Sequence, residues 1–350
     1  MTRRSLLEIP SGVQCFLGDE ARRRREIERV AADVFRGWSY EEIVLPLFDF
    51  DDVFTRGGGS GGISSADGIY RFIGRDGEVM ALRADFTALA AKVVVSRLSR
   101  RELPLRLFYS GEVLRYQPPR AGRREELFQI GLEHLGASGV EADVEVILVA
   151  TEALSKLGID DAVFTLGHVG FALDLLAGVE DPDKRASALE ALKRHDREGL
   201  RRITGTPALD LTELSGGAEV FDRVRGVTGS RDALFRLEAV VAELAAIGLE
   251  RRIRLDLSEV RDFDYYTGLV FEIHAQGSGL ELGGGGRYDS LLGRFGREMP
   301  AIGFYLSLDR VSELLAKRGI SSPESEVSTV ESLKEALEAR RRGARVRVKR

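Results

Sequence analysis

Strand-like segments on both sides of a long helical block constrain the fold more than any other feature of this sequence. Apolar residues at helical spacing predict helices through residues 170–248, with an apolar stripe from Leu237 to Ile247. Strands are predicted on both sides of that block, over residues 106–116, 127–135, 252–257 and 269–275. The pattern therefore predicts an α+β fold, an antiparallel sheet flanked by helices, with a helical insertion at about residues 170–250.

The other segments of residues 1–320 are predicted to complete the same core domain. Further helices are predicted over residues 19–35, 141–157 and 307–316. Residues 38–50 form a predicted strand region, in which Pro46 suits an edge strand or a break in the pairing. A hairpin over residues 71–86 is expected to turn at Gly77.

Residues 321–350 form a charged C-terminal tail. A helix is predicted over residues 331–341, after which Val346 and Val348 alternate with basic residues. A helix followed by an alternating segment is the order at the start of an αβ unit. The tail is therefore interpreted as a truncated remnant of such a unit. The usual behaviour of charge runs favours a solvated, partly disordered tail over a nucleic-acid contact.

Composition limits the class of protein. With 350 residues, 43% hydrophobic and 31% charged, the chain has the content of a soluble globular protein. No apolar run approaches the roughly 20 residues that cross a bilayer, and the N-terminus lacks the apolar core of a secretory signal. A single cysteine, Cys15, excludes an internal disulfide and suits a reducing compartment, so we expect a cytoplasmic protein. The net charge of −5 argues against a general nucleic-acid binder.

Polar groups beside glycines mark a candidate site late in the sequence. Residues 260–272 (VRDFDYYTGLVFE) place Arg261, Tyr265 and Tyr266 beside apolar strand residues. Polar side chains on a mostly buried sheet need hydrogen-bond partners, which a small polar ligand can supply. Residues 283–289 (GGGGRYD) leave room for such a ligand, because glycine allows close approach. A glycine-rich turn beside a satisfied tyrosine network is the alternative interpretation.

A second candidate segment is the strand at residues 127–133 (LFQIGLE). Gln129, Gly131 and Glu133 alternate with apolar residues and therefore share one face. Gly131 is expected to clear space between two polar side chains that can clasp a small ligand. A solvent-facing strand is the alternative, which Gly131 disfavours because a glycine weakens a strand.

Arginines near these segments suggest an anion-binding cleft. Arg83 and Asp85 share one face of the hairpin's second strand, Arg115 ends another strand, and Arg310 lies in the last helix of the core. Taken singly, each arginine suits a surface salt bridge, since arginine is rarely buried unpaired. Taken together with the glycines, they predict a charged cleft built for anions.

No metal or cofactor site is predicted. The four histidines are scattered and lack metal-ligand spacing: His134, His168, His195 and His274. His274 can neighbour Tyr266 in the pocket, although a satisfied sheet histidine is the simpler interpretation. The run GGGGRYD is not a dinucleotide fingerprint, because a sheet surrounds it and not a βαβ unit.

Five motifs resemble one enzyme family. Residues 108–136 (FYSGEVLRYQPPRAGRREELFQIGLEHLG) resemble motif 2 of the class II aminoacyl-tRNA synthetases in its histidyl form. Residues 260–272 and 283–289 resemble the two histidine-recognition motifs of histidyl-tRNA synthetases. Residues 301–310 (AIGFYLSLDR) resemble motif 3, and residues 43–50 (IVLPLFDF) resemble the dimer-forming motif 1. The resemblance implies a class II synthetase-like sheet.

Within residues 9–318, which the resemblance spans, the departures favour a non-synthetase relative, the regulatory-subunit family of ATP phosphoribosyltransferase. Gln117 stands where a synthetase has an acid, Leu127 where histidyl enzymes have an aromatic residue, and Glu125 where they have an arginine. An anion in place of a cation repels a triphosphate, which argues against ATP chemistry. Synthetases also carry a C-terminal anticodon-binding domain, for which residues 321–350 are too short.

The resemblance also implies the residues of a histidine site. In the family pattern, Glu133 and Tyr266 hold the imidazole, which as a neutral ring has one donor and one acceptor. Asp85 and Gln129 take the α-ammonium group, and Arg261 faces the carboxylate. The full set implied for an allosteric histidine site, with no catalytic residue, is Asp85, Thr87, Arg115, Gln129, Glu133, Arg261, Tyr265 and Tyr266.

The expected function is that of a non-catalytic regulatory subunit of ATP phosphoribosyltransferase, which binds histidine for feedback inhibition of histidine biosynthesis. The resemblance implies a short-form catalytic subunit as partner and a homodimer within a hetero-octamer, with the Pro46 strand at the homodimer interface. Neither a membrane nor a nucleic acid is an expected partner. A minimal histidyl-tRNA synthetase that adenylates histidine is one alternative, supported by Arg115, Arg261 and Arg310. A stand-alone amino-acid sensor or RNA-binding paralogue that uses the basic tail is another.

Overall fold

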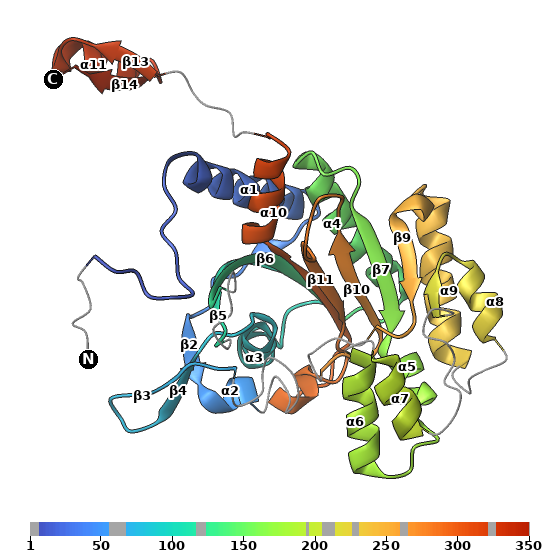
Figure 1. Cartoon of the computed structure of the whole chain (residues 1–350). Helices are drawn as coiled ribbons and strands as arrows, with labels where there is room; N and C mark the ends of the chain where they lie inside the picture. The colour runs from blue at the N-terminus through green and yellow to red at the C-terminus, as the bar shows by residue number, and fades with distance from the viewer. Residues whose placement is uncertain are drawn as a thin grey trace.

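A nine-stranded sheet forms the centre of the computed structural model, which describes residues 7–55, 68–116, 124–193, 196–204, 214–225, 231–259, 265–320 and 327–349 (Figure 1). Its strands follow one another in the order β1 (Glu41–Glu42), β5 (Leu105–Leu114), β6 (Glu126–Leu135), β12 (Ala301–Ser307), β11 (Gly283–Arg287), β10 (Leu269–His274), β7 (Val163–His168), β9 (Ile253–Asp256) and β8 (Ser215–Gly216). Neighbouring strands are antiparallel except β1 with β5 and β7 with β9. The expected antiparallel sheet is confirmed, with a parallel pair toward each edge.

Helices cover both faces of this sheet (Figure 1). One face carries α1 (Gly18–Gly37), α4 (Val140–Lys156) and α10 (Leu308–Lys317), and the other carries α3 (Thr87–Arg97). The apolar spacing in α1 buries Ile27, Ala31 and Phe35 against the sheet, as the sequence predicts for residues 19–35. The main core therefore lies between the sheet and the three helices.

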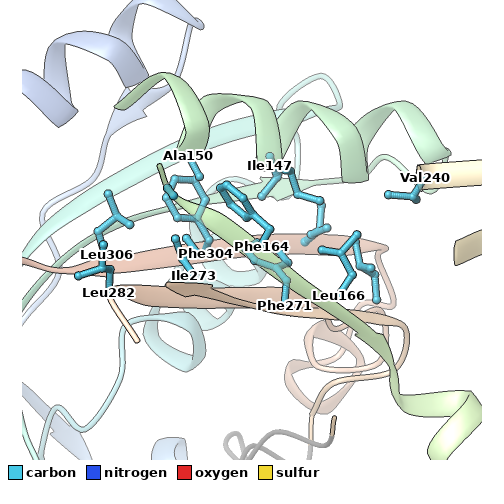
Figure 2. Packing of buried hydrophobic residues seen from close by; sticks show 14 of the residues in the cluster. Ile147, Ala150, Phe164, Leu166, Val240, Phe271, Ile273, Leu282, Phe304 and Leu306 are labelled. Atoms are coloured by element: carbon cyan, nitrogen blue, oxygen red, sulfur yellow. The ribbon is translucent and has the colours of Figure 1, made fainter. Parts of the chain in front are cut away.

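Aromatic side chains fill that core. In Figure 2, Phe164, Phe271 and Phe304 lie between the strands and α4, which presents Ile147 and Ala150 to them. These residues are fully buried or nearly so. The Phe304 ring also packs edge-on against the Phe35 ring of α1, with ring centroids 5.7 Å apart. Around these residues, this face of the sheet is therefore filled with apolar side chains.

The helical block follows β7. It consists of α5 (Val169–Leu175), α6 (Pro182–Lys193), α7 (Arg197–Thr204), α8 (Glu219–Val224) and α9 (Arg231–Ala246), followed by a short 3-10 helix, η2 (Glu250–Arg252). The helices expected over residues 170–248 are thus present. The two-residue strand β8 within the block was not predicted, because it forms only by pairing with β9 and is too short to show a period.

A small three-stranded sheet, in the order β2 (Phe48–Phe50), β4 (Val79–Leu82) and β3 (Arg71–Ile73), stands beside the main one, with the short helix α2 (Asp51–Thr55). Pro46 lies between β1 and β2, so the expected break in pairing is where the chain passes from one sheet to the other. The expected hairpin turns through Gly77, whose φ is 83°.

The glycine-rich run at residues 283–287 is a buried central strand, β11, and not a turn. Glycine is needed there for close packing between strands. A Cβ atom on Gly285 would lie 2.7 Å from the Cα atom of Phe304 in β12. The alternative interpretation of a glycine-rich turn is therefore wrong. A short 3-10 helix, η3 (Leu292–Phe295), follows the strand.

The tail also differs from the favoured expectation. Strand β13 (Val327–Val330), helix α11 (Leu333–Arg341) and parallel strand β14 (Arg345–Val348) form a small βαβ unit, where a partly disordered tail was favoured. The helix begins with Ser332, whose hydroxyl accepts a hydrogen bond from the Glu335 amide at 3.2 Å. Across the described segments of the chain, no helix has the length and apolar character needed to span a membrane.

Candidate functional site

The residues predicted for a ligand site converge on one cavity, on the face of the sheet opposite the main core. Seven of the eight line it, namely Asp85, Thr87, Arg115, Gln129, Glu133, Tyr265 and Tyr266. The eighth, Arg261, lies outside the described residues, as does Gln117. The cavity has a volume of about 20 Å³. Its position follows from strand alternation, because Gln129 and Glu133 point away from the face that Ile130 and Leu132 bury.

Glu133 is the most enclosed polar group in the cavity, with 1% of its surface exposed. Its carboxylate accepts hydrogen bonds from the hydroxyl of Thr87 at 2.8 Å, from that of Tyr109 at 3.3 Å and from that of Tyr288. Burial raises the pKa of Glu133 to about 7, although the hydroxyl donors act in the opposite direction. The group can therefore take up or release a proton near neutral pH.

Glycines make room for these side chains, but not in the way the sequence suggested. The space above Gly131 is filled by Tyr109, whose hydroxyl oxygen lies 2.7 Å from where a Cβ of residue 131 would be. The predicted open gap at Gly131 is therefore wrong, because the facing strand β5 supplies a large side chain there. The glycine that accommodates Glu133 is Gly303, directly opposite it on β12.

Asp85 and Arg115 sit at one side of the cavity. Asp85 is buried just before α3, and its carboxylate accepts a hydrogen bond from the Ala88 amide at 3.1 Å. Burial raises the pKa of Asp85, while that amide and the charge of Arg115 lower it. Arg115 is itself buried and donates from its Nε atom to the Ala84 carbonyl at 2.8 Å. The pair therefore brings one carboxylate and one guanidinium to the same wall.

The charged cleft of arginines is not formed as predicted. Arg83 is buried elsewhere, donating to the carbonyls of Leu45 at 2.9 Å and Glu112 at 2.7 Å, with its guanidinium 3.9 Å from the centre of the Phe86 ring. Arg310 pairs with the carboxylate of Glu281. Backbone carbonyls and a local carboxylate satisfy both arginines, so only Arg115 among the described candidates reaches the cavity.

The described histidines lie outside the cavity. His134 contacts Tyr40 and Glu145 on the helical face, and His168 caps α5 by accepting from the Gly170 amide at 3.1 Å. His274 pairs with Glu272 at 3.0 Å, so the simpler of its two interpretations is confirmed. His195 lies outside the described residues. Across the described ranges, no group of three or more histidine, cysteine, aspartate or glutamate side chains can hold a metal ion.

Two tyrosines of the cavity were missed from the sequence. Tyr109 stacks on Phe86 with ring centroids 4.2 Å apart, and Tyr288 meets Tyr265 edge-on at 5.7 Å. Tyr109 shares its strand face with Arg115, and Tyr288 follows the glycine run after Arg287, so both signals were present. Chemically, the cavity offers two buried carboxyl groups, one guanidinium and several hydroxyls, a donor and acceptor set suited to a small zwitterion.

The sequence is similar to those of known proteins over most of its length. The sequence model of the family described as histidyl-tRNA synthetase matches residues 12–311. The ATP phosphoribosyltransferase regulatory subunit of Moorella thermoacetica is 40% identical over 332 residues, which cover 91% of this chain and 84% of that protein. The regulatory subunit of the same name from Halothermothrix orenii is 33% identical, over 96% of this chain and 84% of that protein.

Solved structures agree with the sequence matches. A protein from Bacillus halodurans, described as an ATP phosphoribosyltransferase regulatory subunit/histidyl-tRNA synthetase, superposes with a TM-score of 0.87 at 26% identity, covering 100% of this chain and 94% of that one. A histidyl-tRNA synthetase from a Nostoc species superposes with a TM-score of 0.78 at 20% identity, covering 99% and 86%. At that identity the likeness shows the fold alone. The predicted class II synthetase-like architecture is confirmed.

Proposed function

Since the chain belongs to the histidyl-tRNA synthetase-like family and, within it, to the ATP phosphoribosyltransferase regulatory subunits, we propose that it is a non-catalytic, histidine-binding subunit of that enzyme. The convergence of Asp85, Gln129, Glu133 and Tyr266 on one cavity carries this proposal. The free amino acid histidine is its proposed ligand.

Histidine suits this cavity group by group. In the proposed complex, the Glu133 carboxylate accepts from one imidazole nitrogen while Tyr266 meets the other. Asp85 and Gln129 take the α-ammonium group, and Arg261 takes the carboxylate. Because the cavity pairs both ring nitrogens, a ligand that lacks one of them leaves a buried polar group unpaired and is rejected.

Two contacts support a regulatory role over the alternative of a histidine-adenylating synthetase. Arg310, the residue resembling a synthetase phosphate ligand, is neutralised by Glu281. Glu125, at the position where histidyl enzymes have an arginine, is held by the hydroxyl of Tyr70. Histidine-dependent exchange between ATP and pyrophosphate by the purified chain would contradict the non-catalytic role.

The proposed partner is a short-form catalytic subunit, in a cytoplasmic hetero-octamer that contains a homodimer of this chain. Histidine bound in the cavity biases the assembly toward a less active state. By linkage, partner binding changes the affinity for histidine by the same factor that histidine changes the affinity for the partner, with a typical coupling of about 1–3 kcal/mol.

Titration calorimetry with histidine tests the ligand. Replacement Glu133→Gln removes a charged acceptor from the imidazole, so we expect at least a tenfold loss of affinity, since hydrogen bonds to charged groups contribute about 1.5–3 kcal/mol. The matched control is Glu78→Gln, because Glu78 is exposed in the small hairpin and lies outside the cavity. Equal histidine affinities in the wild type and in Glu133→Gln would show that Glu133 is not part of the histidine site.

Co-expression with a short-form catalytic subunit tests the regulatory role. We expect phosphoribosyl transfer to require this chain and to fall when histidine is added. Glu133→Gln should preserve the assembly and its basal rate but shift inhibition to higher histidine concentrations. A catalytic subunit that is equally active, and equally inhibited, with and without this chain would refute the proposal.

A further inference from the structure

The cavity proposed to bind histidine is narrow. Its volume of about 20 Å³ is enough for about one water molecule. A free amino acid is several times larger than a water molecule, so at least one of the side chains that line the cavity must move before such a ligand can enter. Which side chain moves depends on how firmly each one is held.

Most polar side chains of the cavity are held by hydrogen bonds. The hydroxyls of Tyr109 and Tyr288 donate to Glu133. Asp85 and Arg115 are bonded to backbone groups near the start of α3. None of these five residues is more than 5% exposed. Moving any one of them would leave buried polar groups unpaired, which is costly.

Tyr305 of β12 also lines the cavity, and it is held less firmly. It is the one residue of β12 that is not fully buried. Its neighbours Phe304 and Leu306 point into the main core (Figure 2), so strand alternation places the Tyr305 ring on the cavity face. Among the described residues, its ring has no aromatic contact and its hydroxyl has no hydrogen-bond partner.

The two strands beside β12 do not hold the Tyr305 ring with a paired side chain. The residues directly opposite Tyr305 are Gly131 on β6 and Gly284 on β11. Cross-strand contacts between paired side chains are what stabilise side chains on a sheet, and a glycine supplies none. Turning the ring outward therefore breaks no hydrogen bond to a described residue and separates no directly paired side chains.

Tyr266 is also partly exposed, but it is more firmly placed. Its ring packs against that of Tyr265, with ring centroids 4.9 Å apart. On another side, the Tyr266 ring lies 2.9 Å from where a Cβ atom of residue 286 would be, directly against the backbone of Gly286. These contacts oppose rotation of Tyr266, so Tyr305 is the aromatic side chain that we expect to move.

Tyr305 also lies where a ligand has to pass. On the cavity face of β12 it stands between Gly303 and Ser307. These two residues are directly opposite Glu133 and Gln129 of β6, respectively. A ligand that contacts both Glu133 and Gln129 therefore lies beside Tyr305, whose partial exposure puts its ring at the boundary between the cavity and solvent.

We propose that Tyr305 is the gate of this cavity: its ring closes the entrance and turns outward to let the ligand in and out. The inference rests on the proposed function, because histidine is the ligand whose passage the ring controls. The ring is the main barrier to exchange of the ligand. Its size consequently sets the rate of exchange, whereas the polar groups of the cavity select the ligand.

Exchange of isotope-labelled histidine between the free and the bound state, followed by NMR on the full chain, tests the gate. Tyr305→Ala removes the ring, so we expect the association and dissociation rate constants both to rise at least about tenfold. Tyr305→Phe keeps the ring and removes only a hydroxyl, so its rates should stay within about twofold of the wild type. Tyr305→Trp enlarges the ring and should slow exchange.

A second variant and a folding check keep the test decisive. Tyr305→Leu also removes the ring but keeps an apolar side chain, and circular dichroism checks that each variant is folded. Wild-type exchange rates in both Tyr305→Ala and Tyr305→Leu would overturn the gate and leave the proposed function intact. Absence of histidine binding in the wild type itself would instead overturn the proposed function, and the gate with it.

Discussion

At the scale of single residues, Glu133 sets the chemistry of the cavity proposed to bind histidine. Burial on the sheet disfavours its charge, and three hydroxyl donors favour it. The balance leaves the pKa raised from 4.5 to about 7, so burial has the larger effect. A carboxyl group with this pKa can accept a hydrogen bond from an imidazole without carrying a permanent buried charge in the empty protein.

The raised pKa of Glu133 predicts a pH-dependent stability. Between pH 4.5 and about 7, the Glu133 carboxyl group is protonated in the native state but ionised in the unfolded chain. Its contribution to the free energy of unfolding is therefore complete below pH 4.5 and is lost as the pH rises through about 7. At 1.36 kcal/mol per pKa unit, the wild type should lose about 3 kcal/mol from this group. Urea unfolding at several pH values checks this, because Glu133→Gln should lack that part of the loss. Parallel pH profiles for both proteins would contradict it.

At the scale of elements, one buried charge network joins three of them. Asp143 in α4 is fully buried and binds Arg287 of β11 on one carboxylate oxygen and Arg236 of α9 on the other, at 2.5 Å and 2.7 Å. Arg287 also donates to Asp289 at 3.0 Å, just after β11. The network therefore holds β11 against the helical block. Before Arg287, β11 consists of glycines and has no side chains that could pack there.

Removing Asp143 should be costly. Asp143→Ala leaves the buried Arg287 without its main partner, and breaking a buried ion pair destabilises a protein by about 3–5 kcal/mol. The control Asp33→Ala breaks exposed pairs with Arg29 and Arg36 on α1, which should cost about 1 kcal/mol or less. Midpoints of urea unfolding compare the two. Similar losses in both variants would mean that the network adds no stability beyond that of surface ion pairs.

At the scale of the whole molecule, the small sheet presents an apolar face that no element of the described chain covers. Phe48 and Phe50 of β2 are 49% and 50% exposed, and Phe72 of β3 is 39% exposed. Phe48 packs edge-on against Phe72 with ring centroids 5.5 Å apart. Adjoining aromatic residues of this kind mark interaction surfaces, which supports the proposed homodimer interface at the strand that follows Pro46.

Charge placed on this face should separate the proposed homodimer. We expect the double substitution Phe48→Lys with Phe72→Lys to raise the dissociation constant of the dimer at least tenfold, because buried aromatic residues dominate interfaces. Analytical ultracentrifugation of the free chain measures it. The control Phe235→Lys changes a residue of α9 that is 74% exposed, and should have no effect. A dimer equally strong in the double variant and the control would place the interface elsewhere.

Local patterns in the sequence determined the elements and most of the site. Helical spacing located α1, α4 and α10, and strand alternation located the face of β6 that carries Gln129 and Glu133. Both depend only on neighbours along the chain, which is why they could be read without a fold. The resemblance to histidyl-tRNA synthetases then indicated which residues would meet in the cavity.

Only the tertiary structure decided which groups meet across strands. That Gly303 makes room for Glu133, that Tyr109 fills the space above Gly131, and that Glu281 neutralises Arg310 all depend on strand register or loop position. Residues paired in this way are far apart in the sequence, and a shift of register by one residue would turn each side chain to the other face. A single sequence specifies the faces of its strands through their alternation, but the partners of each face are set by the packing of the whole sheet.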